Sequence, residues 1–309
     1  MTLSPFRTRL HATAAILALA SACRPASPAP VPGGPELVGP GVIATDANEY
    51  NPSLTPDGRT LVFARSEPDF RNAKIHVSTW SGAGWAPPAQ VPFSDPRFTD
   101  SDPTLSDDGG ELYFVSNRPH AGRDSTRRDL DLWRVPRVGA GWGTPEPVPG
   151  VNTRAQELGP QRRGEWLYFA STRSGMRGRL DLYRARLQGD SVGPVEDLPV
   201  NTPENESDPE VSPAGTLLLF WSSRGNAAGG ADLFVAERQG DGWGAPRPLG
   251  GGANSPGFDF TPSISADGRW LYFSSTRADA AGTGPSPTNP SAPAHIYRMP
   301  LRAALGTAR

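Results

Sequence analysis

The sequence lacks most of the features on which a redox, nucleic-acid-binding or membrane-spanning function would depend. Cys23 is the only cysteine among 309 residues, so no internal disulfide can form. The apolar run from Ala12 to Ala20 is too short to span a bilayer, which takes about 20 residues. Lysine and arginine number 30 against 32 aspartate and glutamate residues. This balance gives no charge excess for a nucleic-acid partner or an anionic membrane surface.

Motifs for cofactors and catalysis are also missing. The sequence contains no Walker loop and no dinucleotide fingerprint. His76, His120 and His295 do not have the spacing of metal ligands. Ser191 lies in GDSVG, which matches the nucleophile-elbow pattern, but equivalent turns read GAGWG and GDGWG. Ser191 is therefore expected at an ordinary hairpin turn, and the sequence predicts no catalytic residue, no metal and no cofactor.

Glycine and proline are abundant instead, at 35 residues each, which suits many short strands joined by tight turns. Five prolines begin five copies of one unit, at spacings of 51, 57, 49 and 53 residues. In three copies an Asp-Gly turn follows, and all five continue with a strand such as LYF that ends in an aligned phenylalanine. The repeat prolines are Pro52, Pro103, Pro160, Pro209 and Pro262.

Each copy then adds a third strand, such as DLWRV at residue 131, and a fourth after a glycine turn. A four-stranded unit that repeats about every 50 residues is typical of a propeller blade. The fifth copy ends before its fourth strand, whereas the segment from Pro35 resembles the missing piece. We therefore predict an all-β, five-bladed propeller of four-stranded antiparallel blades, closed by an N-terminal strand in the last blade. Six blades is the alternative.

The repeated pattern of an acid, Pro, Leu-Ser-x-Asp-Gly, Leu-Tyr-Phe, Ser-x-Arg and Asp-Leu-Trp/Tyr resembles the TolB-type, WD-repeat-like propeller repeats of bacterial envelope proteins. The likeness covers residues 36–302. It implies the fold strongly and the function weakly, because propellers carry many unrelated activities.

The N-terminus is typical of a secretory signal peptide, with Arg7 and Arg9 before the apolar run. The stretch LASAC ending at Cys23 resembles the lipobox of bacterial lipoproteins, although Ala20 stands where that family usually has leucine. An ordinary cleaved signal with an incidental cysteine is the alternative. We expect a signal peptide in 1–22, lipidation at Cys23, a Pro/Ala-rich tether in 23–35, the propeller in 36–302 and a tail in 303–309. The predicted location is the bacterial envelope, at the outer membrane facing the periplasm.

An acid lies three residues before each repeat proline, where the innermost strand of a blade begins. If these carboxylates line the mouth of the central channel, they form a ring that attracts cations or a basic peptide. Between its proline and its aligned phenylalanine the third copy is two residues shorter, which leaves the equivalence of its acid open. The five acids are Glu49, Asp100, Glu157, Glu206 and Asp259.

Four arginines each follow an aligned phenylalanine by four residues, at the same end of the blade as the acids. The alternative to a binding ring is therefore a structural brace, in which arginine and acid pair within or between blades. In the first copy Arg65 comes two residues after Phe63, so its pairing would have to differ. The predicted brace arginines are Arg118, Arg173, Arg224 and Arg277.

Two long loops join second to third strands in the second and fifth copies. The former carries Arg123, Arg127 and Arg128, which are candidates for contact with an acidic partner. The leading functional hypothesis is a monomeric, lipid-anchored module that binds an envelope protein or a cell-wall component. The rival is a glycan hydrolase or lyase that uses channel-mouth carboxylates, with Asp100 and Glu206 as the residues to test.

Overall fold

The computed structural model describes residues 33–121, 129–175, 177–189, 191–226, 230–277 and 292–306. The predicted signal peptide, Cys23 and most of the tether lie outside the described residues, as do Arg123, Arg127, Arg128 and the last three residues. Of the helices that the structure describes, none combines the length and the apolar character that crossing a membrane requires.

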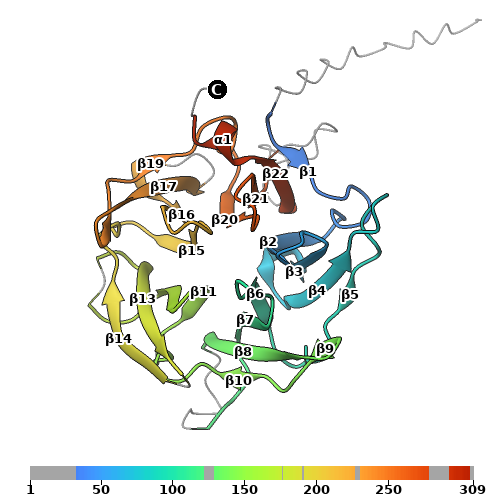
Figure 1. The fold of residues 1–309 in the computed structure, drawn as a ribbon, viewed down its shortest axis with the longest axis horizontal. Helices are drawn as coiled ribbons and strands as arrows, with labels where there is room; N and C mark the ends of the chain where they lie inside the picture. The colour runs from blue at the N-terminus through green and yellow to red at the C-terminus, as the bar shows by residue number, and fades with distance from the viewer. Residues whose placement is uncertain are drawn as a thin grey trace, which may run out of the picture.

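Five antiparallel sheets follow one another around a ring, as Figure 1 shows, and this confirms the predicted five-bladed propeller. The first two blades contain the strands from β2 to β10. Blade 1 consists of β2 (Asn48–Leu54), β3 (Thr60–Ser66), β4 (Lys74–Thr79) and β5 (Ala89–Gln90). Blade 2 consists of β6 (Asp100–Leu105), β7 (Glu111–Ser116), β8 (Asp131–Val138) and β10 (Glu146–Pro147), with β9 (Gly141–Trp142) also paired to β8.

The other three blades repeat this order. Blade 3 consists of β11 (Glu157–Arg163), β12 (Trp166–Ser171), β13 (Asp181–Gln188) and β14 (Ser191–Asp197). Blade 4 consists of β15 (Glu206–Val211), β16 (Leu217–Ser222), β17 (Asp232–Gln239) and β19 (Arg247–Pro248), with β18 (Gly242–Trp243) also paired to β17. Blade 5 consists of β20 (Asp259–Ile264), β21 (Trp270–Ser275), β22 (His295–Pro300) and β1 (Glu36–Leu37).

The aligned phenylalanines explain how the blades pack. Each is fully buried in the second strand of its blade. In blades 3 to 5 it stacks on an aromatic ring of the third strand, with centroids about 6 Å apart, as for Phe169 and Tyr183 at 5.9 Å. Side chains from neighbouring blades share each apolar cluster, so Phe169 of blade 3 packs with Tyr113 of blade 2. The core is therefore a ring of clusters between blades.

The N-terminal strand closes this ring as the sequence predicted. In β1, Glu36 pairs with Arg298 and Leu37 with Tyr297 of β22. The amide of Val38 extends the pairing by donating to the carbonyl oxygen of Ile296 at 2.9 Å. This pairing joins the two ends of the described chain into one blade and covers an edge that would otherwise be open.

The chain continues past β22 into one short helix, α1 (Leu301–Ala304). Leu301 and Ala304 are buried in the apolar cluster between blades 4 and 5. The amide of Gly250 donates to the carbonyl oxygen of Ala304 at 2.8 Å. Residues 303 to 305, which the sequence assigned to a tail, thus pack against the ring.

Candidate functional site

The five repeat acids occupy equivalent places and are all removed from solvent. Each has an exposed fraction of 0%. Each forms an ion pair with an arginine of its own blade, at N to O distances from 2.6 to 3.4 Å. This arginine lies in the second strand in blade 1 and two residues after the end of the second strand in the other blades. The pairs are Glu49 with Arg65, Asp100 with Arg118, Glu157 with Arg173, Glu206 with Arg224, and Asp259 with Arg277.

Blade 4 shows the hydrogen bonds of one such acid and arginine bracket. Thr202 donates to Glu206 through its amide at 3.0 Å and its hydroxyl at 2.7 Å. The Ser222 hydroxyl donates to the same carboxylate at 2.8 Å and accepts from the amide and Nε of Arg224. The guanidinium also donates to the carbonyl oxygen of Val200 at 2.8 Å. The repeated Ser-x-Arg and the acid are therefore parts of one charge-assisted unit.

The third blade keeps this bracket despite its shorter hairpin. Glu157 is opposite Ser171, in the register that Asp100 has with Ser116. The residues missing from blade 3 are in the turn, where only Gly164 and Glu165 separate β11 from β12. Glu157 is therefore equivalent to the other acids.

The first blade forms the same kind of ion pair with its arginine at a different position. Arg65 occupies the position opposite Glu49 that serine occupies in the other blades. Its guanidinium still donates to Glu49 at 3.1 Å and to the carbonyl oxygen of Ile43 at 3.1 Å. Nδ1 of His295 lies 3.0 Å from the other carboxylate oxygen. Arg65 therefore pairs with Glu49 although it is displaced in the sequence. His295 of blade 5 contacts the carboxylate in place of the serine side chain.

These positions correct the expectation of an open ring of carboxylates at the channel mouth. An acid with no exposed surface and a full set of protein donors presents no free oxygen to a ligand. The residues that do face the channel come two positions later, directly before the repeat prolines. A β-bulge in the first hairpin of every blade turns them toward the axis.

All five bulge residues have the left-handed backbone conformation, with φ between 49° and 52°. Four of them are asparagine, aspartate or glycine, which tolerate this conformation, and the fifth is a β-branched threonine. The following proline has no amide hydrogen to leave unpaired at the bulge. The bulge residues are Asn51, Asp102, Gly159, Asp208 and Thr261.

Two of these bulge residues place carboxylates inside the ring. Asp102 accepts from the amide of Gly159 at 3.0 Å. Asp208 accepts from the side chains of Trp221 at 2.6 Å and Asn51 at 3.3 Å. Burial raises the pKa of both groups, and the charge of Asp102 adds to the effect on the pKa of Asp208, which rises to about 7. This pair therefore gains a proton more readily than surface carboxylates do.

A second polar layer lies next along the channel. The side chain of Gln161 donates to Glu210 at 2.7 Å, and the amide of Ile264 donates to it at 2.9 Å. Burial raises the pKa of Glu210 to about 7, against the opposing charge of Arg163. The two channel cavities have volumes of only about 20 and 40 Å³. The first holds about one water molecule, and neither admits a sugar ring.

Gly159 provides a test of how closely the bulges pack. A Cβ atom there would lie 2.9 Å from the Cα of Asp208 and 2.6 Å from its carboxylate. We expect Gly159→Ala to lower the free energy of unfolding by about 2 to 3 kcal/mol, from backbone strain plus this clash. Gly164→Ala is the matched control, because Gly164 also has positive φ but nothing within 4 Å of its Cβ position. Equal losses for the two variants in urea unfolding would contradict the close packing.

An aromatic cluster packs beside the channel carboxylates. Tyr50, Phe70 and Phe260 form edge-to-face and tilted contacts with centroids from 5.2 to 6.2 Å apart. Phe70 belongs to a short 3-10 turn between β3 and β4, η1 (Pro68–Phe70), and its exposed fraction is 41%. Within the described residues no group of three acidic, histidine or cysteine side chains is placed to hold a metal ion.

Comparisons with known proteins identify the fold alone. No family model matches the sequence, and no curated protein matches it. Among solved structures, a TolB candidate from Agrobacterium tumefaciens is 18% identical, with 83% of this chain and 91% of that chain covered, at a TM-score of 0.51. A thermostable family-43 glycoside hydrolase is 10% identical, with 85% and 92% covered, at a TM-score of 0.56.

TolB from Acinetobacter baumannii is 18% identical and covers 71% of this chain, at a TM-score of 0.46. This chain spans 46% of that protein's length. The protein is a propeller similar in fold to the TolB candidate from Agrobacterium tumefaciens and to the family-43 glycoside hydrolase.

Proposed function

We propose that the protein is a lipid-anchored binding module of the bacterial envelope, which holds another envelope protein or a cell-wall component on the outside of a closed propeller. This proposal rests on the observation that the central channel has no room for a substrate. Its carboxylates are engaged by protein donors, and its cavities of about 20 and 40 Å³ are closed to a substrate. Two larger hollows that described residues line, of about 530 and 590 Å³, lie outside the channel.

The N-terminal sequence supports the rest of the proposal. The lipobox-like stretch before Cys23 would attach the protein to the outer membrane, and the Pro/Ala-rich segment after it would act as a tether on the periplasmic side. The balanced charge favours a protein or cell-wall partner over nucleic acid. The module is proposed to act as a monomer.

The rival function, a glycan hydrolase or lyase, gains no support from the channel. Asp100 and Glu206 are buried in arginine brackets and have no exposed surface. A glycosidase needs two carboxylates that flank the bond to be cleaved, with room for the sugar between them. The likeness to a family-43 hydrolase extends to the fold only.

Cell fractionation and affinity capture test the proposed function. The unaltered protein should fractionate with envelope membranes, and Cys23→Ser should move to the soluble fraction because no lipid can be attached. Crosslinked envelopes should yield the same partner, protein or peptidoglycan fragment, in repeated captures through an affinity tag at the C-terminus. Cys23→Ser that stays with membranes would overturn the anchor, and captures without a reproducible partner would overturn the binding role.

A further inference from the structure

Trp80, in the outer part of blade 1, differs from the residues at the same position of the other blades. Its backbone amide donates to the residue that precedes the second strand, as it does in every blade. Blades 3 and 5 have a leucine there, Leu187 and Leu301. Blades 2 and 4 have an arginine, whose guanidinium lies over the tryptophan of the glycine turn, 5.2 Å from the ring centre for Arg137 and 5.0 Å for Arg238. Blade 1 has Trp80 instead, paired across the turn with Trp85.

The tryptophan at this position of blade 1 is exposed. Trp80 has an exposed fraction of 40%, which is high for so large an apolar side chain. Trp80 and Trp85 meet edge to face, with ring centres 5.5 Å apart and an interplanar angle of 67°. Neither indole N–H donates to another described residue. The pair thus offers one flat face, one ring edge and two free donors.

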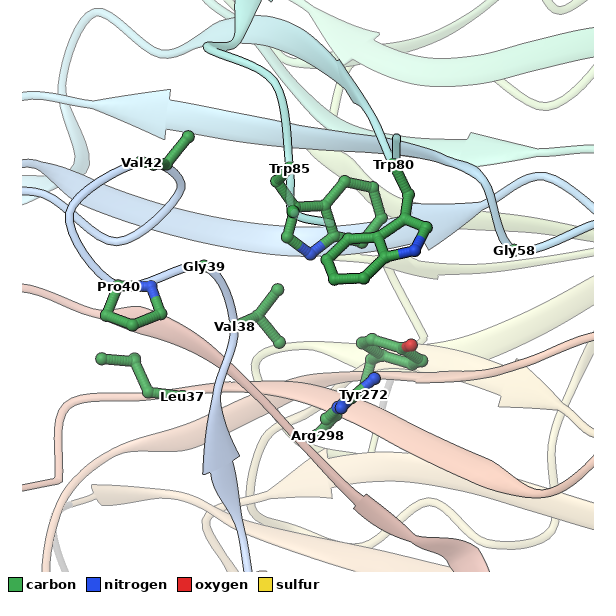
Figure 2. Close-up of a pocket in the computed structure, with 11 residues that line it drawn as sticks. Leu37, Val38, Gly39, Pro40, Val42, Gly58, Trp80, Trp85, Tyr272 and Arg298 are labelled. Carbon is green, nitrogen blue, oxygen red and sulfur yellow. The ribbon is translucent and has the colours of Figure 1, made fainter. Parts of the chain in front are cut away.

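The two indoles form one side of a pocket of about 530 Å³ between blades 1 and 5. Figure 2 shows Tyr272 and Arg298 of blade 5 across from them, with Val38 between. This volume is in the usual range for small-molecule sites, about 300 to 1,000 Å³. The pocket therefore combines a broad apolar lining with a few polar groups at one end.

The ring closure builds the remaining wall. After β1 the chain turns through Gly39 and Gly41, both with positive φ, before it returns to the core at Ile43. The carbonyl oxygen of Gly39 accepts three amides, from Val42 at 3.0 Å, Ile43 at 2.7 Å and Ala44 at 3.2 Å. This folded loop is held firmly against Trp85, whose ring lies 3.2 Å from the Cβ position of Gly39. The wall is therefore preformed.

The charge of the pocket restricts its ligand. Arg298 is the only charged side chain among the described residues that line it. Its guanidinium donates to Glu36 at 3.2 Å and lies over the ring of Trp270, 4.7 Å from the centre. Burial raises the pKa of Tyr272, so its phenol remains a neutral hydroxyl. A site with aromatic walls and one cation that is already paired with a carboxylate suits an uncharged ligand with one apolar face and hydroxyls on its rim.

We propose that this pocket binds a neutral saccharide unit, which stacks one ring face on Trp80 and places its hydroxyls near Tyr272 and Arg298. A pyranose has apolar C–H faces and a polar rim, and this matches the single flat platform. A proline-rich peptide usually packs into aromatic-lined grooves, and the edge-to-face indoles present one open face. The inference rests on the proposed binding function and names its ligand class and surface.

Calorimetric titration of the full chain with chitohexaose, cellohexaose and maltohexaose tests this, in a detergent without sugar headgroups. We expect at least one of these oligosaccharides to bind and to shift tryptophan fluorescence to shorter wavelength. Trp80→Ala should weaken binding at least about tenfold, through loss of a ring stacked on an aromatic face. Trp80→Phe should restore part of the affinity. Phe70→Ala is the matched control, since Phe70 is 41% exposed in another part of blade 1, and it should leave affinity unchanged.

Three results would overturn the assignment. These are no binding of any of the oligosaccharides, full affinity in Trp80→Ala, or binding of a proline-rich decapeptide that Trp80→Ala abolishes while the sugars do not bind. Thermal unfolding of each variant shows whether it is folded. If Trp80→Ala keeps full affinity for the saccharide and still captures the envelope partner, the proposed binding function stands and the pocket assignment fails. Saccharide binding by the unaltered chain would stand even if no envelope partner were captured.

Discussion

Replacing Arg224 with methionine should lower the free energy of unfolding by about 3 to 5 kcal/mol at neutral pH, because it leaves a buried charge without its partner. Glu206 has no exposed surface, and the guanidinium lies 3.0 Å from its carboxylate. Methionine keeps the apolar contact with Phe220 and Phe234, over which the guanidinium lies at 5.2 and 5.1 Å. The decrease in the free energy of unfolding therefore comes mainly from the lost ion pair and less from lost packing. Urea unfolding measures it.

Arg247→Met is the matched control, since Arg247 pairs with Glu237 at 3.7 Å on the surface, where both side chains are well exposed. We expect it to cost no more than about 1 kcal/mol. Adding Glu206→Gln to Arg224→Met should restore part of the stability, because the buried charge is then removed. Similar small losses for Arg224→Met and Arg247→Met would show that the brackets do not brace the blades.

Replacing Asp208 with asparagine should stabilise the protein above neutral pH and reduce its pH dependence. The pKa of Asp208 is raised from 3.8 to about 7 in the folded state. The folded protein therefore holds a proton that the unfolded chain has already lost, so stability falls as the pH rises from about 4 to about 7 and then levels off. Asparagine stays neutral and keeps an oxygen for the Trp221 N–H. The gain at about pH 8 should be on the order of 3 kcal/mol.

Urea unfolding between about pH 5 and about pH 8 measures this dependence. Asp57→Asn is the control with the opposite sign. A hydrogen bond from Thr55 lowers the pKa of Asp57, so the charged form is favoured in the folded state and its loss should destabilise slightly. If Asp208→Asn were less stable than the unaltered protein at both ends of this range, Asp208 would be a charged residue that the channel requires.

The sequence predicts the blades well because its repeat is written in residues that determine local structure. The Asp-Gly turns, the buried Leu-x-Phe strands and the incomplete fifth copy together indicate five blades and the strand that closes them. The four arginines and their acids could also be matched, because a hairpin brings equivalent positions together. The doubtful case, Glu157, depended on where two residues are missing, and the sequence alone does not distinguish a shorter strand from a shorter turn.

The residues that line the channel and the aromatic pocket were not predicted, for two different reasons. The residue before each repeat proline faces the axis only because a bulge turns it, and strict alternation along a strand does not include that bulge. The signal that was available is the run of Asn, Asp, Gly and Asp at this position, residues suited to positive φ. Trp80 is the only tryptophan among the five equivalent positions, which are otherwise arginine or leucine, but the residues that face it come from blade 5 and the N-terminal segment.

The shared last blade has a consequence for how the chain folds. Glu36 and Arg298 are 262 positions apart, yet they belong to adjacent strands of one sheet. The chain must therefore be synthesised past β22 before this sheet can assemble, and contacts of such long range form slowly. Until then β1 has no partner strand and presents its unpaired backbone groups to other chains. A product shortened near its C-terminus would lose both this sheet and the packing of α1, and would remain open to aggregation.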